Sequence, residues 1–432
     1  MEMEKLYTLF CEHPTVTTDS RNCPEGSIFF ALKGTSFNGN AFATQALEKG
    51  CAYAVVDEPA YANDPQGRII RVEDCLAALQ QLARLHRRTL GTRIIGITGT
   101  NGKTTTKELI AAVLAEKYHI LYTQGNLNNH IGVPLTLLRL RPEHELAVVE
   151  MGASHPGDIR ELVEIAEPDY GLITNVGKAH LEGFGSFEGV VRTKGELYDF
   201  LRQRKGGHIF LAHDNPHLTA IAAGLPHTDY GTEEGLYVSG QLTDCSPFLA
   251  FRWKEAGDKT SHDVRMRLIG SYNLDNALAA VAVGTYFDVP AEQIVHALEA
   301  YDPQNNRSQL KDTGRNQLII DAYNANPTSM AAALQNFRGI RAPHKMVILG
   351  DMKELGEAST EEHQKIADLV EQCRFERVLL AGCEFQATRT TLPVVEDAAA
   401  AIRILQQNPP QGFCILIKGS NSMKLPQVVD YL

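Results

Sequence analysis

The sequence predicts an α/β protein of three domains: a small α/β domain, a central doubly wound parallel sheet that carries a phosphate-binding loop (P-loop), and a C-terminal doubly wound, Rossmann-like sheet. Three observations support this prediction. The chain has 432 residues, which is too long for one ordinary core. Apolar runs with the character of buried strands alternate with helical patterns, as in parallel sheets covered on both faces. The alternation breaks near residue 90 and starts again near residue 305, so we expect domains over residues 1–90, 91–304 and 305–432.

The first domain is predicted from two apolar runs and two helical stretches. Residues 27–32 and 52–56 have the length and composition of short strands. Residues 41–49 form a helical stretch between them. A long helix follows, with leucines at helical spacing from Leu76 onward, and it ends near Gly91 because glycine commonly closes a helix.

The second and third domains are predicted from further apolar runs. In the second domain these runs cover residues 94–98, 147–150 and 171–174, and residues 240–270 favour antiparallel strands at the edge of its sheet. In the third domain the predicted strands cover residues 318–321, 345–350, 377–382 and 413–418. Ligands of such sheets gather at the carboxyl ends of the strands, where the polar motifs of this sequence also lie.

Composition and charge argue against several classes of protein. The net charge of −11 disfavours a protein that grips nucleic acid, since such a protein needs a concentrated basic face. The acidic N-terminus leads into no long apolar run, so we expect neither a secretory signal nor a membrane span. We therefore expect a cytoplasmic location. The eight cysteines form no Cys-x-x-Cys pair, which favours packed thiols over a structural zinc site.

A glycine-rich segment joins the first central strand to the next helix, and it consists of Gly99, Thr100, Asn101, Gly102, Lys103, Thr104 and Thr105. The glycines let backbone N–H groups point at phosphate oxygens, Lys103 adds a positive charge and Thr104 offers a hydroxyl to Mg²⁺. The pattern is shorter than the usual P-loop, because Ile97 stands where a further glycine is expected. A turn that binds nothing is the alternative, but the order of strand, glycines, lysine and hydroxyls favours ATP.

Glu150 ends a predicted apolar strand near this loop. An ionised carboxylate in an apolar setting is costly unless it is paired, and a metal ion beside Thr104 is a natural partner. The alternative is an ordinary solvated glutamate at the end of a strand. The proximity of the phosphate-binding loop favours the metal ligand.

The short loop and the motifs that follow it resemble the Mur ligase family, ATP-dependent amide-forming enzymes of peptidoglycan precursor synthesis. The matching segments of the central domain are residues 125–136, 150–152, 175–182, 194–196 and 270–277. Residues 321–330 and 349–356 are similar to the branch that adds D-alanyl-D-alanine to UDP-N-acetylmuramoyl-tripeptide, and residues 18–21 resemble the region that holds the UDP end. The chain departs from the family pattern at His130, at Tyr272 and at residues 38–40, where it reads Asn-Gly-Asn.

The resemblance implies a mechanism and a set of site residues. ATP converts the peptide carboxylate to an acyl phosphate, which the amine of D-alanyl-D-alanine then attacks. The implied catalytic residues are Lys103, Glu150, His180, Lys194 and Arg307. The implied Mg²⁺ ligands are Thr104, Glu150, His180 and Lys194, the last as a lysine carbamylated by CO₂. The nucleotide is expected to contact the phosphate-binding loop together with Asn273, Arg307, Asp321, Tyr323 and Asn324. The substrates are expected to contact Ser20, Arg21, Asn128, Asn129, Asn326 and Lys418.

Several alternatives remain open at this stage. Without the resemblance, Lys194 fits a lysine on a helix surface and Asn273 fits a helix N-cap. A sister ligase that adds a single amino acid shares the early motifs, and a nucleotide-switched regulator or a pure binding module would use the same loop. The sequence leaves open the third residue of the tripeptide and the base for the incoming amine. For the oligomeric state we expect a monomer, without nucleic acid or membrane partners.

Overall fold

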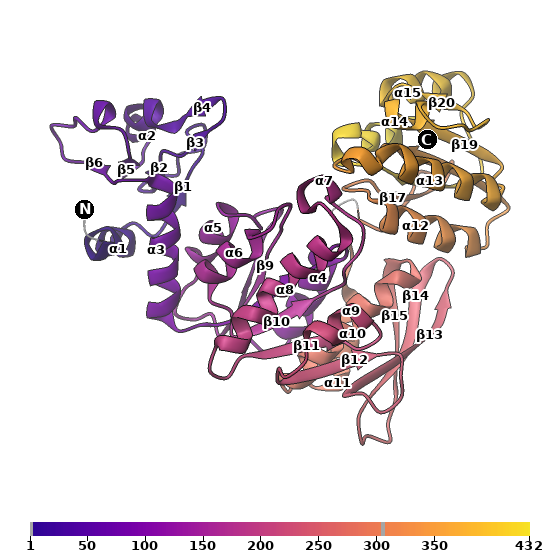
Figure 1. The fold of residues 1–432 in the computed structure, drawn as a ribbon, viewed down its shortest axis with the longest axis horizontal. Coiled ribbons are helices and arrows are strands. Elements are labelled where there is room, and N and C mark those ends of the chain that lie inside the picture. Colours follow the sequence, from indigo (N-terminus) through magenta and orange to yellow (C-terminus); the bar gives the residue numbers. More distant parts are fainter. Residues whose placement is uncertain (1–2, 304–306) are drawn as a thin grey trace.

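The computed structural model describes residues 3–303 and 307–432, and it contains three separate main sheets along an elongated molecule (Figure 1). The N-terminal sheet lies at one end, the nine-stranded central sheet in the middle and the six-stranded C-terminal sheet at the other end. The predicted three-domain α/β fold is thus confirmed. The predicted boundary between residues 304 and 305 lies outside the described residues.

The N-terminal domain is a four-stranded parallel sheet of order β1-β2-β5-β6 with helices beside it. Its elements are α1 (Met3–Glu12), β1 (Val16–Thr17), β2 (Ile28–Phe30), β3 (Lys33–Gly34), β4 (Phe37–Asn38), α2 (Ala43–Glu48), β5 (Tyr53–Val56), β6 (Ile69–Arg71) and α3 (Cys75–Leu90). Asp74 caps α3 by accepting a hydrogen bond from the Ala77 N–H, and Gly91 closes the helix at a φ of 69°. The predicted end of this helix is therefore confirmed.

Helix α3 also attaches the N-terminal domain to the central one. Arg87 donates to the carbonyls of Ala166 and Glu167 and pairs with Asp169 at 2.9 Å. Arg84 and Arg88 both pair with the Glu167 carboxylate. These contacts hold the helix against the end of α6 (Asp158–Ala166).

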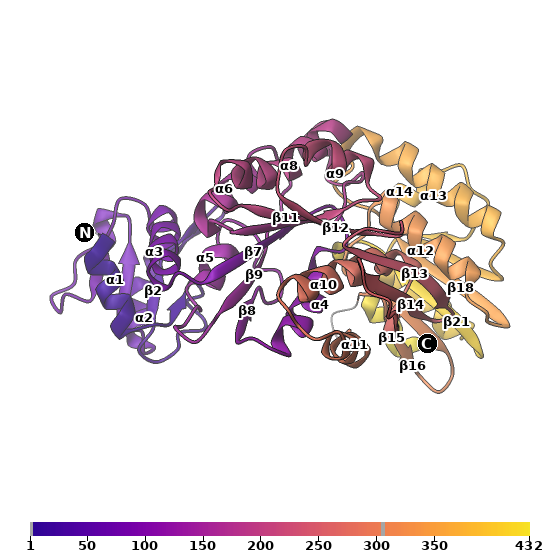
Figure 2. The same cartoon turned by 90° about the horizontal axis from the view of Figure 1, so that it is seen from below.

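The central sheet has the order β15-β14-β13-β12-β11-β10-β7-β9-β8. Its strands are β7 (Arg93–Thr98), β8 (Ile120–Tyr122), β9 (Leu146–Glu150), β10 (Tyr170–Ile173), β11 (His208–Ala212), β12 (His227–Gly231), β13 (Val238–Cys245), β14 (Phe248–Glu255) and β15 (His262–Ile269). Strands β13 to β15 pair antiparallel at one edge, as predicted, and the others pair parallel. Helices α6 and α8 (Phe187–Gln203) cover one face, and α4 (Lys103–Ala115), α10 (Leu274–Tyr286) and α11 (Ala291–Ala300) cover the other (Figure 2).

The C-terminal sheet has the order β16-β17-β21-β18-β19-β20, with only β16 antiparallel to its neighbour. Its elements are β16 (Gln309–Asp312), β17 (Gln317–Asp321), α12 (Pro327–Gly339), β18 (His344–Gly350), α13 (Ser359–Cys373), β19 (Arg377–Ala381), α14 (Cys383–Gln386), β20 (Val394–Val395), α15 (Ala398–Gln407) and β21 (Phe413–Lys418). Val347 and Leu349 of β18 join one apolar core, and Met346 and Ile348 join the other. This alternation is the expected result of burying both faces of a strand.

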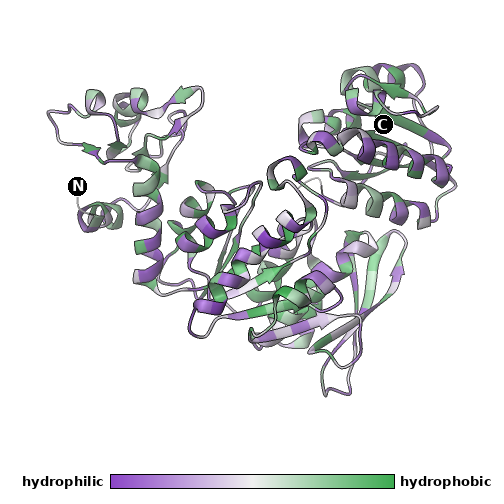
Figure 3. Cartoon of the chain, viewed as in Figure 1, coloured by the Kyte–Doolittle hydropathy of each residue, from purple (hydrophilic) through white to green (hydrophobic). Residues whose placement is uncertain are grey.

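The apolar core on one face of the C-terminal sheet also includes residues of the central domain. Ile269, at the end of β15, belongs to this core and Phe248 of β14 packs against it. The antiparallel edge of the central sheet is thus in apolar contact with the C-terminal domain. Figure 3 shows apolar residues along these strands and mixed hydropathy on the outer helices.

All eight cysteines are free thiols. Cys51, Cys75 and Cys414 are buried, as packed thiols should be, but Cys11 and Cys383 are exposed, so the prediction of packed thiols is wrong for these two. Within residues 3–303 and 307–432, no helix combines the length and apolar character needed to cross a membrane.

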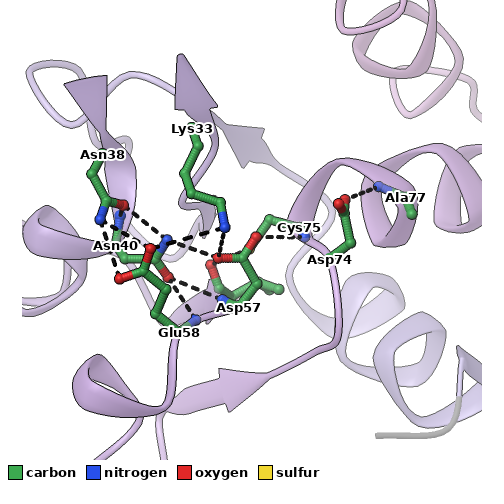
Figure 4. Close-up of polar contacts among 9 residues, drawn as sticks. Lys33, Asn38, Asn40, Asp57, Glu58, Asp74, Cys75 and Ala77 are labelled. Atoms are coloured by element: carbon green, nitrogen blue, oxygen red, sulfur yellow. Dashed lines mark hydrogen bonds and ion pairs between the residues drawn. The ribbon is translucent and has the colours of Figure 1, made fainter. Parts of the chain in front are cut away.

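The unusual Asn-Gly-Asn segment at residues 38–40 is the centre of a polar network in the N-terminal domain (Figure 4). The buried Asn40 amide donates to Asp57 at 2.9 Å and to Asn38 at 3.0 Å, and its oxygen accepts from the Asp57 and Glu58 N–H groups. Lys33 pairs with Asp57 at 3.1 Å. A Cβ on Gly39 would lie 2.4 Å from the Leu32 carbonyl oxygen, so only glycine fits between the two asparagines.

Replacing Asn40 with alanine should destabilise the N-terminal domain. The change leaves two backbone N–H groups without their partner and removes one of the donors to the Asp57 carboxylate, which costs about 2 kcal/mol. Hydrogen exchange of the β5 amides should report faster opening, whereas Gln45→Ala, which removes an exposed amide on α2, should leave the exchange unchanged. Equal exchange in both variants would contradict this role of the network.

Candidate active site

A cavity of about 720 Å³ lies between the central and C-terminal domains. This volume is in the range of small-molecule sites. Its lining includes most of the residues predicted from the sequence: Thr100, Asn101, Gly102, Lys103, Thr104, Thr105, Asn128, Asn129, Glu150, His180, Asn273, Arg307, Asp321, Tyr323, Asn324, Asn326 and Lys418. The carboxyl ends of β7, β9, β17 and β21 therefore supply polar groups to one cleft, as parallel sheets favour.

The phosphate-binding loop connects β7 to the first turn of α4. Gly99 and Gly102 have φ angles of 143° and 78°, which favour glycine. A Cβ on Gly99 would lie 2.0 Å from the Thr174 hydroxyl oxygen, and one on Gly102 would lie 2.5 Å from Asn276 Oδ1. Both glycines are therefore required by backbone conformation and by close approach.

Lys103 bends back over this loop. Its Nζ donates to the carbonyls of Gly99 at 2.8 Å and of Thr100 at 3.0 Å. Burial lowers the pKa of Lys103 to about 8, although the neighbouring Glu150 carboxylate acts in the opposite direction. Because both bonds go to loop carbonyls, the ammonium group lies where a phosphate on the loop would meet it.

Glu150 is buried at the end of β9, with 1% of its surface exposed. Its Oε1 accepts from Thr104 Oγ1 at 3.2 Å and from Asn128 Nδ2 at 2.8 Å. Its Oε2 is buried and has no hydrogen-bond partner among the described residues. A solvated glutamate is therefore the wrong interpretation, and the oxygen donors of Glu150 and Thr104 fit a hard cation such as Mg²⁺.

Lys194 is buried in α8, with 2% of its surface exposed, so the alternative of a surface lysine is wrong. Its Nζ lies 3.4 Å from the Ala153 carbonyl oxygen and 5.2 Å from the centre of the Phe184 ring. Burial and then the charge of Lys103 lower the pKa of Lys194 well below its ordinary value. The lowered pKa favours the neutral form of this amine, which is the form that reacts with CO₂.

His180 precedes the short helix α7 (Leu181–Phe184) and has a φ of 50°. The residue lines the cleft, and its Nδ1 lies 2.5 Å from the Glu354 carboxylate of the C-terminal domain. His180 is thus placed at the interface between the two domains.

Asn273 occupies the N-cap position of α10, as the alternative predicted, but its side chain makes no capping hydrogen bond. Its amide donates to the Ile269 carbonyl at 2.8 Å, and its oxygen accepts from Asn276 Nδ2 at 2.8 Å. Asn276 in turn accepts from Thr106 of α4 at 2.9 Å. A chain of amides therefore connects the helix of the phosphate-binding loop to the edge strand β15.

The C-terminal side of the cleft contains three of the predicted charges. The Arg307 guanidinium lies 3.9 Å from the centre of the Tyr323 ring, a cation–π contact. Lys418 Nζ lies 2.6 Å from Asp321 Oδ2 and donates to the Asn324 carbonyl at 3.2 Å. Asp321 and Lys418, which were predicted to have separate partners, thus form an ion pair with each other.

Asn326 connects the two sides of the cleft. Its amide donates to Asn101 of the phosphate-binding loop at 2.7 Å, while its oxygen caps α12 through the Ser329 N–H at 2.9 Å. Two further contacts cross the interface nearby, from Lys178 to Glu362 at 3.0 Å and from the Tyr272 hydroxyl to Ser308 at 2.9 Å.

Four of the predicted residues do not line the cleft. Ser20 and Arg21 belong to the N-terminal domain, where the Arg21 guanidinium is exposed and pairs with Asp19 at 2.8 Å. Gly99 and Lys194 lie just behind the lining, and the loop carbonyl of Gly99 is bonded to Lys103. Lining residues without a role predicted from the sequence include Ser154, His155, Asp158, Thr328 and Glu354. The first three lie within eight residues of Glu150, after the end of the same strand, and this position was a usable signal.

A P-loop at the end of a parallel strand, facing a Rossmann-like domain across a cleft, defines a nucleotide-dependent multidomain enzyme. Three family domain profiles match the chain: "Mur ligase family, catalytic domain" at residues 14–87, "Mur ligase middle domain" at residues 97–284 and "Mur ligase, glutamate ligase domain" at residues 306–421.

Curated relatives and solved structures agree with these profiles. The chain is 36% identical to UDP-N-acetylmuramoyl-tripeptide--D-alanyl-D-alanine ligase of Bacillus subtilis, over 96% of this chain and 92% of the relative. The enzyme of that name from Escherichia coli is 35% identical over 96% and 93%. MurF from Acinetobacter baumannii superposes with a TM-score of 0.86 at 32% identity, over 96% of this chain and 92% of that structure. MurF ligase from Thermotoga maritima in complex with ADP gives 0.84 at 26% identity, over 96% of each chain. The chain belongs to the Mur ligase family, as the motifs predicted.

Proposed function

We propose that this protein uses ATP to join D-alanyl-D-alanine to the terminal carboxylate of UDP-N-acetylmuramoyl-tripeptide, in peptidoglycan precursor synthesis. The observation that supports this most is the single cleft in which a buried, incompletely paired Glu150 and the phosphate-binding loop face polar residues of the C-terminal domain. Relatives named for this reaction align with nearly the whole chain. We further propose that it acts in the cytoplasm as a monomer, without nucleic acid or membrane partners.

The domains have separate roles in this proposal. Residues 1–90 bind the UDP end through Ser20 and Arg21, residues 91–304 bind ATP, and residues 305–432 complete the site for ligation. Asn128 and Asn129 contact the peptide substrate, and Asn326 and Lys418 contact the incoming dipeptide. If the ion pair between Lys418 and Asp321 opened, the Lys418 ammonium could bind the dipeptide carboxylate. The Asp321 carboxylate could then accept hydrogen bonds from the ribose of ATP.

The chemistry proceeds in two steps. The peptide carboxylate attacks the γ-phosphorus of ATP, which forms an acyl phosphate and releases ADP. The amine of the dipeptide then attacks the acyl carbon, and phosphate leaves from the tetrahedral intermediate with loss of the amine proton. Lys103 and Arg307 stabilise charge on the transferred phosphoryl group, and Asn273, Tyr323 and Asn324 position the nucleotide.

Two divalent cations are part of this proposal. Thr104 and Glu150 would hold one Mg²⁺, and His180 with a carbamylated Lys194 would hold the second. When bound, these ions neutralise charge that builds up on the phosphoryl oxygens. Burial of Lys194 lowers its pKa and so favours the neutral, nucleophilic amine, which supports the proposed carbamate.

The proposed carbamate should be visible spectroscopically. Protein equilibrated with ¹³C-bicarbonate is expected to show a carbamate carbon resonance that disappears in Lys194→Met, because methionine keeps the apolar stem but has no amine. Lys205→Met, at an exposed lysine, serves as the control. The same resonance in wild type and in Lys194→Met would reject Lys194 as the carbamylated residue.

One incubation tests the overall function. The protein is mixed with ATP, Mg²⁺, D-alanyl-D-alanine and each candidate UDP-tripeptide, and the products are weighed by mass spectrometry. The expected product gains one dipeptide and is accompanied by one ADP. Addition of a lone amino acid but not the dipeptide would favour a sister ligase, and ATP hydrolysis that is independent of any UDP-peptide would favour a nucleotide-switched regulator.

A further inference from the structure

Glu354 is the group of the C-terminal domain that meets His180. His180 Nδ1 lies 2.5 Å from Glu354 Oε2. The Nδ1 atom is buried and makes no hydrogen bond within the described part of the chain, so the Glu354 carboxylate is the polar group available to it.

The backbone on both sides of this contact is unusual. His180 has a φ of 50° and Glu354 a φ of 66°, and residues other than glycine are uncommon in this left-handed region. Such residues concentrate at functional sites, where the surrounding structure holds them in place. Here two of them face each other across one domain interface.

The segment that carries His180 is docked on the C-terminal domain at neighbouring points. The Lys178 N–H donates to the Thr328 hydroxyl at 3.3 Å, and the Lys178 ammonium pairs with Glu362 at 3.0 Å. A Cβ on Gly356 would lie 3.2 Å from Glu182 Cβ. The segments that carry Gly356 and Glu182 are thus in close contact on the other side of His180 as well. The position of His180 therefore depends on the C-terminal domain.

We propose that Glu354 is a positioning residue for His180. Nδ1 makes no hydrogen bond in this arrangement of the described residues, and in the proposed state a small adjustment of the ring or the carboxylate lets Glu354 accept the Nδ1 proton. This bond fixes the ring tautomer and leaves Nε2 as the ligand atom for a divalent cation. Because Glu354 belongs to the C-terminal domain, this half of the metal site is complete only when that domain is docked. The inference rests on the proposed role of His180 as a metal ligand.

Metal binding without turnover tests this inference. Full-length protein is saturated with a non-hydrolysable ATP analogue and titrated with Mn²⁺, and free Mn²⁺ is followed by electron paramagnetic resonance. Glu354→Ala should raise the Kd of the second Mn²⁺ about tenfold, which is the lower end of the range for residues that orient a metal ligand, because the Glu354 side chain is 60% exposed. The first Mn²⁺ should bind as in wild type. Glu354→Gln keeps an acceptor oxygen and should recover part of the affinity.

Controls distinguish this inference from the proposed function. Glu357→Gln removes an exposed carboxylate three residues further along and should change neither Kd. If His180→Ala loses the second Mn²⁺ but Glu354→Ala does not, the inference alone is wrong. If wild type binds one Mn²⁺ and His180→Ala leaves it unchanged, the metal assignment and the inference both fail. A raised KM for D-alanyl-D-alanine with unchanged Mn²⁺ binding would make Glu354 a substrate-binding residue and overturn the positioning role.

Discussion

Lys103→Ala is expected to lower kcat about a thousandfold, since cations that stabilise the transferring phosphoryl group have effects of this order. Among the described residues, Lys103 donates hydrogen bonds only to carbonyls of its own loop, so its loss should leave the domain folded. ATP analogue binding should weaken in parallel, because the lysine contacts phosphate in both the ground state and the transition state. Single-turnover formation of ADP and calorimetric titration measure the two effects.

A matched control for this variant is Lys205→Ala, which removes one exposed positive charge from the same domain. Its kcat and its affinity for the analogue should equal those of wild type. Undiminished turnover in Lys103→Ala, with the fold verified by circular dichroism, would show that the loop has no catalytic role.

Glu150→Gln is expected to have the second largest effect, a loss of kcat of about a hundredfold to a thousandfold. The change keeps the shape of the side chain but removes the charge that would hold Mg²⁺. In wild type, Mg²⁺ with ADP should raise the Tm because the ligands bind only the folded state, and this rise should shrink in the variant. Without ligands the variant should be at least as stable as wild type. In wild type, Glu150 Oε2 is charged and has no hydrogen-bond partner among the described residues, and the glutamine removes this buried charge.

Thermal unfolding with and without Mg²⁺ and ADP, alongside turnover, measures both consequences. Glu143→Gln, at an exposed position shortly before the same strand, should behave as wild type. A variant that loses activity but keeps the full Mg²⁺-dependent rise in Tm would place the cation elsewhere.

The fold was largely predictable because apolar runs and helix ends depend on local sequence. The run at residues 94–98 became β7 with one more residue, and Gly91 ended α3 as its conformation requires. Two-residue strands such as β1 and β3 were not predicted, since they are too short to have a period. The order of the strands was also beyond reach, because it depends on contacts between distant segments.

The same distinction applies to the site. The phosphate-binding loop and Glu150 were recognisable from a strand followed by polar residues. The burial of Lys194 could not be recognised, because the neighbouring Arg192 on α8 suggests an exposed face. Packing of α8 against other elements determines which of its side chains are buried. The pairing of Asp321 with Lys418 follows from the parallel register of β17 and β21, which joins residues almost a hundred positions apart. Glu354 lies in the motif at residues 349–356, but its contact with His180 crosses a domain boundary and had no local signal.

The apolar contact of Phe248 and Ile269 with the C-terminal core limits how the cleft can open. Free separation of the two domains would expose these side chains to water, whereas the polar contacts of Asn101, Lys178 and His180 can exchange for water at little cost. A motion that keeps the apolar contact must rotate about it. The antiparallel edge of the central sheet would then serve as the pivot, and the loop side of the cleft would travel farthest.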